Sequence, residues 1–130
     1  NPNNFRNRKT GTLAVAAAGV AANFFIALVF GMVLRFAPVF FDVSPSFYFI
    51  TSIIVVVNLA LGIFNLVPIP PLDGSKILFS LLPDSAAEAM YAIEQNALIL
   101  LLVFLVFFAD FLFPILAFLF QLITGVPLMS

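Results

Sequence analysis

The chain has 130 residues, of which 64% are hydrophobic and only 8% carry a charge. Because a soluble domain usually has roughly a quarter of its residues charged, this composition excludes a soluble globular domain, and the high apolar content excludes a disordered chain. Five basic residues against six acidic ones also exclude nucleic acid as a partner. The composition therefore predicts an integral, multi-pass membrane protein in contact with the lipid bilayer.

The residue types that are absent restrict the chemistry of the chain. It has no Cys and no His, so it lacks disulfides, thiolate ligands and the commonest acid–base side chain at neutral pH. Any metal binding or proton transfer within this chain must therefore use its six acidic residues. The chain begins with Asn1 instead of Met, and we expect it to be the interior or C-terminal part of a longer protein.

The first stretch is polar and basic, with Arg6, Arg8 and Lys9. Because it lacks the apolar core and cleavage site of a signal peptide, we expect residues 1–12 to form a loop beside the membrane. The uncharged run that follows predicts a first membrane span over about residues 13–35, since about 20 apolar residues of helix cross a bilayer. Small residues fill its first half, which we expect to pack against protein.

A second uncharged run predicts a span over about residues 46–67. It ends at three prolines, Pro68, Pro70 and Pro71. Proline removes a backbone donor and disfavours helix in the residue before it. We therefore expect residues 66–72 to form an extended, non-helical loop.

The last apolar stretch contains Asp110 and Pro114, and two interpretations compete. One is a single long span with a buried Asp. The other is a span over about residues 92–108, a turn, and a further helix over about 113–123. A charge at mid-bilayer costs about 2.5–3.5 kcal/mol or more, and proline suits the first turn of a helix. These two arguments favour the second interpretation.

The predicted fold is an all-α polytopic membrane protein forming one domain over residues 1–130. It has three transmembrane helices, a C-terminal membrane-associated or re-entrant helix, and an extended proline-rich loop after the second span. Positive residues are enriched in cytoplasmic loops, and four of the five basic residues lie on one predicted side. We therefore expect the loop at Asp73 to face the cytoplasm. The four are Arg6, Arg8, Lys9 and Lys76, and the fifth is Arg35.

The stretch from Asn65 to Gly74 is the best candidate for a functional site. A membrane helix ends there, prolines follow, and Asp73 appears next to Gly74. Non-helical backbone at membrane depth occurs where it is buried in protein or lines a water-filled cavity, and a carboxylate in such a place suits a metal. The same pattern also suits an ordinary Asp-Gly turn, so the residues alone leave both interpretations open.

The pattern Asn-x-x-Pro-x-Pro-x-Leu-Asp-Gly, from Asn65 to Gly74, resembles the site-2 protease family of intramembrane zinc metalloproteases, peptidase family M50. A second similarity is Gly19 followed by Asn23 in a membrane span after a basic loop, although Val20 stands where the family usually has proline. The His-Glu-x-x-His motif of the family is absent from this sequence. We expect it to lie upstream in a longer protein.

The resemblance implies a role for each residue of the motif. Asp73 would be a zinc ligand, completed by two upstream His residues, and Asn65 would orient the loop or the substrate. Asn23 would support the developing oxyanion. Pro68, Pro70, Leu72 and Gly74 would shape the substrate-binding loop.

The activity that the resemblance implies is hydrolysis of peptide bonds in or near transmembrane segments of a membrane-protein substrate. The location it implies is a bacterial-type cell membrane. This segment alone would be inactive. Two alternatives stay open on the residues: a catalytically inactive membrane scaffold of the same fold, and a fragment of a transporter. Few intramembrane charges and no internal repeat make the transporter the weaker of the two.

Overall fold

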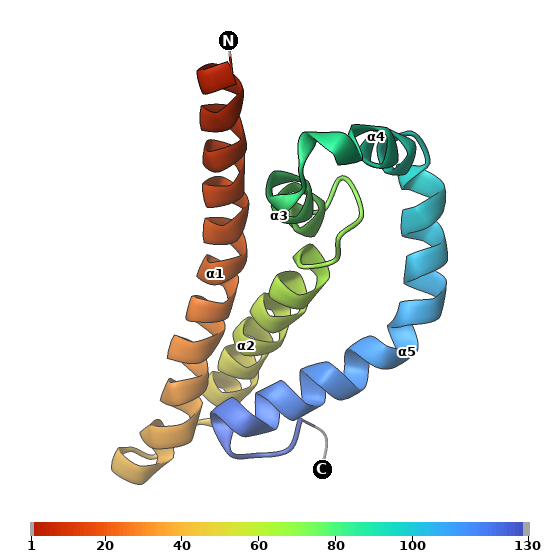
Figure 1. Ribbon diagram of the computed structural model, residues 1–130. Helices are drawn as coiled ribbons and strands as arrows, with labels where there is room; N and C mark the ends of the chain where they lie inside the picture. The colour runs from red at the N-terminus through yellow and green to blue at the C-terminus, as the bar shows by residue number, and fades with distance from the viewer. Residues whose placement is uncertain (1, 129–130) are drawn as a thin grey trace. The chain divides into compact units, whose positions relative to one another are not determined.

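In the computed structural model, which describes residues 2–128 and the side chains from residue 7 onward, every regular element is helical (Figure 1). No strand occurs among these residues. Three of the helices are long and apolar enough to cross a membrane: α1, α2 and α5. The elements are α1 (Pro2–Phe40), α2 (Pro45–Asn65), α3 (Asp73–Leu81), the short 3₁₀ helix η1 (Asp84–Ala86), α4 (Ala87–Gln95) and α5 (Ala97–Thr124).

The chain divides into two compact units. The first unit contains Asn1–Ala21 and Ile63–Phe107, and the second contains Ala22–Gly62 and Phe108–Ser130. Helices α3 and α4 therefore lie entirely in the first unit, together with the N-terminal half of α1. The second unit is built from the C-terminal half of α1, most of α2 and the end of α5.

The predicted loop over residues 1–12 is wrong, because α1 begins at Pro2 and is helical through the basic stretch. Proline is well suited to the first turn of a helix, where its missing N–H would have no partner. Gly11 is the poorest helix former after it in that stretch and costs about 1 kcal/mol relative to Ala. The first helix is therefore longer than the membrane span within it.

The predicted break in the last apolar stretch is also wrong. A single helix, α5, runs through Asp110 and Pro114, and the helix expected over 113–123 is part of it. The preceding α4 ends at Gln95, so the span also starts later than the expected residue 92. Pro114 removes one backbone hydrogen bond, a loss that membrane helices tolerate. Asp110 is exposed on the surface of α5, so the helix does not bury its carboxylate.

The second unit is held by a stripe of small and branched side chains on α2. Thr51, Val55, Leu59 and Gly62 are buried, at the three- and four-residue spacing of one helix face. A methyl group at Gly62 would lie 2.9 Å from Cζ of Phe24, so the ring of Phe24 packs directly on the glycine. Small residues of this kind allow membrane helices to approach closely.

The end of α5 is anchored in the second unit by Arg35 of α1. The Arg35 Nη1 donates hydrogen bonds to the carbonyls of Leu122 and Ile123, at 3.0 and 3.1 Å. These carbonyls belong to the last turn of α5, where no further helical N–H is available to them. Gly125 follows with a φ of 79°, the left-handed conformation that commonly ends a helix.

Candidate metal-ligand site at the start of helix α3

The proline segment between α2 and α3 is non-helical, as predicted, but it is folded into turns instead of extended. The Ile69 N–H donates to the Val67 carbonyl at 2.9 Å, and the Leu72 N–H donates to the Ile69 carbonyl at 2.9 Å. The second turn contains the cis peptide bond between Pro70 and Pro71. Leu72, immediately before α3, has an extended backbone with φ −70° and ψ 153°. The loop is therefore shorter in space than an extended segment would be.

Asp73 is the first residue of α3. A carboxylate in the first turn of a helix interacts favourably with the unpaired N–H groups there and with the positive end of the helix dipole. The side chain of Asp73 is 30% exposed, so it is neither sealed in the core nor fully in solvent. The fold thus places one carboxylate at a helix start directly after the loop.

Gly74 packs against the backbone that ends α2. A methyl group at this position would overlap the carbonyl oxygens of Leu66 and Val67, so no larger residue fits. The next residue, Ser75, is buried, and its hydroxyl donates to the Leu72 carbonyl at 2.7 Å. These contacts fix the first turn of α3 against the loop, and with it the position of Asp73.

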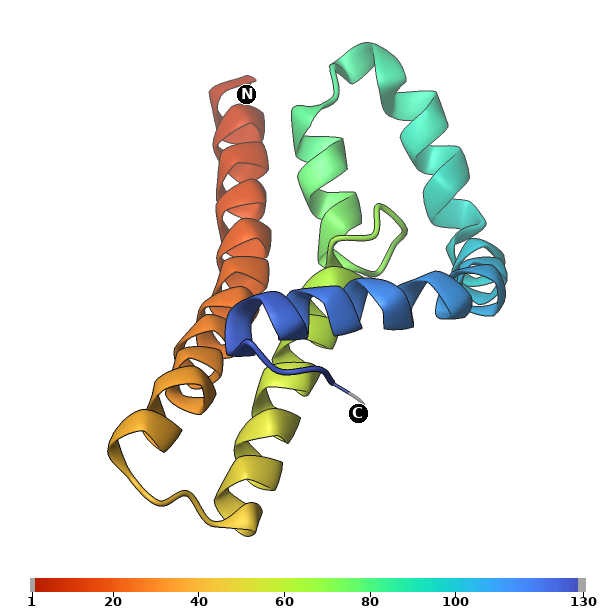
Figure 2. The ribbon, with the colours of Figure 1, turned by 90° about the horizontal axis from the view of Figure 1, so that it is seen from below.

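Gly19 of α1 faces Asp73. The position that a methyl group would take on Gly19 lies 3.4 Å from Oδ2 of Asp73, so the missing side chain gives the carboxylate its space. Both views show α3 beside the N-terminal half of α1 (Figures 1 and 2). The sequence alone did not predict this pairing, because Gly19 is one small residue among many in its span.

A cation also lies close to the carboxylate. Nζ of Lys76 is 3.7 Å from Oδ1 of Asp73, a pair of residues three apart on one helix. Such spacing brings side chains onto the same helix face, so the sequence contained the signal for this pair. Since the Lys76 side chain is 53% exposed, the ion pair contributes little to stability.

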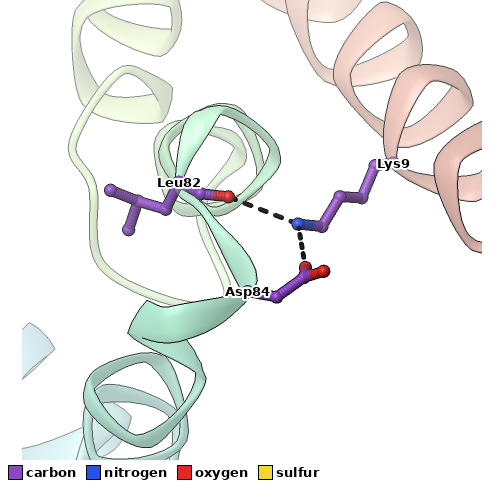
Figure 3. Close-up of polar contacts among 3 residues, drawn as sticks. All are labelled: Lys9, Leu82 and Asp84. Atoms are coloured by element: carbon purple, nitrogen blue, oxygen red, sulfur yellow. Dashed lines mark hydrogen bonds and ion pairs between the residues drawn. The ribbon is translucent and has the colours of Figure 1, made fainter.

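A second polar contact joins α1 to the connection between α3 and α4. The Lys9 Nζ donates to the Leu82 carbonyl at 3.3 Å and pairs with Oδ1 of Asp84 at 3.0 Å (Figure 3). Leu82 directly follows α3, so this contact holds the far end of the helix that begins with Asp73. Both ends of α3 therefore contact α1 within the first unit: its start through Gly19, and its end through Lys9.

The other predicted site residues lie at several depths. Leu72 is buried, Asn65 and Pro70 are half-buried, and Pro68 is exposed; all four are in the first unit with Asp73. Asn23 is half-buried within α1 and belongs to the second unit. The four residues from 65 to 72 therefore share a compact unit with Asp73, whereas Asn23 does not.

The donors available for a metal can be tested against this geometry. Within the part of the chain that the structure describes, no three His, Cys, Asp or Glu side chains are grouped to hold a metal. A catalytic zinc ion takes about three protein ligands, among which a carboxylate oxygen is common. Asp73 fits as one such ligand, since it is partly exposed, held on a helix start and free of a facing side chain at Gly19.

Comparison with known proteins decides the family. The model of peptidase family M50 matches residues 41–109, which include all of α2, the proline loop and Asp73. The chain belongs to peptidase family M50. Gly19 and Asn23 lie before the matched range, whereas Asn65, Asp73 and Gly74 lie within it.

Two relatives of this M50 chain have metalloprotease names. A Methanocaldococcus jannaschii protein named zinc metalloprotease is 38% identical over 74 residues, covering 57% of this chain and 21% of the relative. A Bacillus subtilis protein with a provisional zinc metalloprotease name is 32% identical over 112 residues, covering 78% of this chain and 49% of the relative. The chain thus spans half or less of the length of these relatives. No solved structure matches it.

Proposed function

We propose that this M50 chain forms part of the membrane-embedded core of a zinc protease that cleaves peptide bonds in or near transmembrane segments of other membrane proteins. The observation that carries the proposal is the position of Asp73 at the start of α3, with its Oδ2 facing Gly19. The family and the names of the relatives support a protease, and the three apolar helices support a site within a membrane.

In this proposal Asp73 is a zinc ligand, and two His residues from a part of the protein outside this chain complete the set. Bound zinc polarises a carbonyl and lowers the pKa of its water to about 7. Gly74 fixes the direction of Asp73, and Ser75 holds the first turn of α3 through the Leu72 carbonyl.

The loop residues are proposed to position the substrate. A helix hides its peptide bonds in its own hydrogen bonds, so a transmembrane substrate must unwind locally before it is cut. Asn65 ends α2, and Pro68, Pro70 and Leu72 lie in the turn-rich segment between α2 and Asp73. We propose that an unwound substrate backbone lies along this segment. Asn23 carries an amide that donates hydrogen bonds, and we propose that it supports the oxyanion.

We further propose that the loop at Asp73, in the first unit, faces the cytoplasm of a bacterial-type cell. Arg8, Lys9 and Lys76 all belong to the first unit, whereas Arg35 belongs to the second. An excess of basic residues on the cytoplasmic side is the general rule for membrane proteins.

Replacement of the proposed ligand tests the function. In the full-length protein, we expect Asp73→Asn to lower the bound zinc and to abolish cleavage of a transmembrane substrate, because the amide is a poor ligand. The measurements are zinc content by mass spectrometry and cleavage by gel assay in detergent. Asp42→Asn, the same change at an exposed position between α1 and α2, should retain both. Cleavage at the wild-type rate by Asp73→Asn would contradict the proposal.

A further inference from the structure

Two adjoining cavities lie in the first unit. One, of about 440 Å³, is lined by residues of α1, α3 and α4, and the other, of about 560 Å³, follows α1. They share Arg8, Thr12 and Lys76 in their linings. The two cavities therefore adjoin at these residues, and together they make up a hollow with a cationic centre.

The charges around this hollow favour an anion. Arg8, Lys9 and Lys76 line the first cavity, and Glu94 is the one acidic residue among its lining side chains. Lys9 is engaged with Asp84 and Leu82, and Lys76 lies near Asp73. The Arg8 side chain is exposed in the shared part of the hollow, where its guanidinium has five donors in a planar fork.

The walls of the hollow are apolar in two places. Gly11 and Val15 line the second cavity along α1, and the Val15 side chain is 75% exposed. Phe79, Met90 and Tyr91 line the first cavity beside α4. This part of α1 lies at the beginning of the candidate membrane span Asn7–Phe40. We therefore expect the cations to lie at the level of the bilayer headgroups, with the apolar wall along Gly11 and Val15 leading into the span.

We propose that this hollow binds one anionic phospholipid. Its phosphate lies between Arg8 and Lys76, and one acyl chain follows Gly11 and Val15. Arginine binds phosphate oxygens through two parallel hydrogen bonds, and basic pockets at membrane surfaces select anionic headgroups. A free phosphate ion would use the cations alone and would leave the apolar wall along α1 uncovered.

Lipid selectivity tests the cationic part of the site. The full-length protein, stripped of lipid in detergent, is titrated with phosphatidylglycerol or phosphatidylcholine of the same chain length, and bound lipid is counted by native mass spectrometry. We expect phosphatidylglycerol to bind at least about tenfold more tightly. Arg8→Gln should weaken its binding about fivefold, whereas Arg8→Lys, which keeps the charge, should retain most of it. Equal binding of the two lipids, or wild-type binding by Arg8→Gln, would overturn the proposal.

A second variant separates a lipid from a free anion. Nothing lies within 4 Å of a methyl group built on Gly11, so Gly11→Leu fits the helix while filling the path of the acyl chain. We expect this variant to lose phosphatidylglycerol binding and to keep its melting temperature. If Gly11→Leu binds the lipid as the wild type does, or if equimolar inorganic phosphate displaces it, the site takes free phosphate and the lipid proposal fails.

Discussion

At the scale of single residues, two glycines decide where the Asp73 carboxylate lies. Gly74 lets α3 begin against the carbonyls of Leu66 and Val67, and Gly19 leaves the space into which the Asp73 side chain extends. Neither position has a left-handed backbone, since Gly125 is the glycine with positive φ in the described part of the chain. Close approach of two segments, and not backbone freedom, is therefore what requires glycine here.

Replacement of Gly74 tests this packing. We expect Gly74→Ala to destabilise the protein by about 1–3 kcal/mol, because the added methyl group overlaps two backbone oxygens that cannot rotate away. Thermal unfolding in detergent measures the effect. Gly11→Ala, where a methyl group meets open space, should leave the melting temperature unchanged or raised. Equal melting temperatures for Gly74→Ala and the wild type would contradict this prediction, because they would show that the loop backbone shifts to accommodate the methyl group.

At the scale of elements, each unit is fastened by a basic side chain of α1 that reaches backbone carbonyls. Lys9 binds the Leu82 carbonyl just after α3, and Arg35 binds the Leu122 and Ile123 carbonyls at the end of α5. Carbonyls at a helix C-terminus lack helical partners, so a cation there satisfies them and complements the helix dipole. The two contacts fix helix ends that the apolar sequence leaves unspecified.

The Arg35 contact can be measured directly. We expect Arg35→Ala to cost about 1.5–3 kcal/mol of stability, since two charge-assisted hydrogen bonds to the end of α5 are lost. Hydrogen exchange at the amides near Gly125 should rise in this variant. Arg35→Lys, which keeps one donor group and the charge, should restore part of the stability. An unchanged melting temperature in Arg35→Ala would mean that water replaces the guanidinium without loss.

At the scale of the whole molecule, the chain presents three long apolar helices whose outer surfaces suit lipid. The most apolar 18-residue window of α5 has none of its residues buried, and that of α2 has 22% buried. Such exposure would promote aggregation in water, whereas in a bilayer it is the expected surface. The membrane therefore serves as the solvent for α5.

Cysteine labelling tests the predicted orientation, and the chain contains no cysteine of its own. Asp42→Cys lies between α1 and α2, and Glu88→Cys lies in α4. Because the proposed topology has one crossing of α2 between these positions, we expect a membrane-impermeant maleimide to label Asp42→Cys on intact cells and Glu88→Cys after the cells are opened. Labelling of both from outside would contradict the single crossing by α2 and the cytoplasmic assignment of Asp73.

The sequence by itself determined that this is an all-helical membrane chain, that α2 ends before the prolines, and which motif carries Asp73. These features depend on composition and on local backbone chemistry, which a sequence displays directly. The membership of family M50 also followed from a linear pattern, from Asn65 to Gly74.

Only the tertiary structure decided how α1 begins, whether α5 breaks, and what surrounds Asp73. Residues 2–12 and the residues around Pro114 are helical. The free-energy difference between helix and loop is small in these stretches, so packing against neighbouring segments decides between them. The partners of the carboxylate come from segments far apart in sequence, as with Gly19, or from packing, as with Gly74 against Leu66. Contacts of that kind form only when the chain folds, so a local sequence pattern does not predict them.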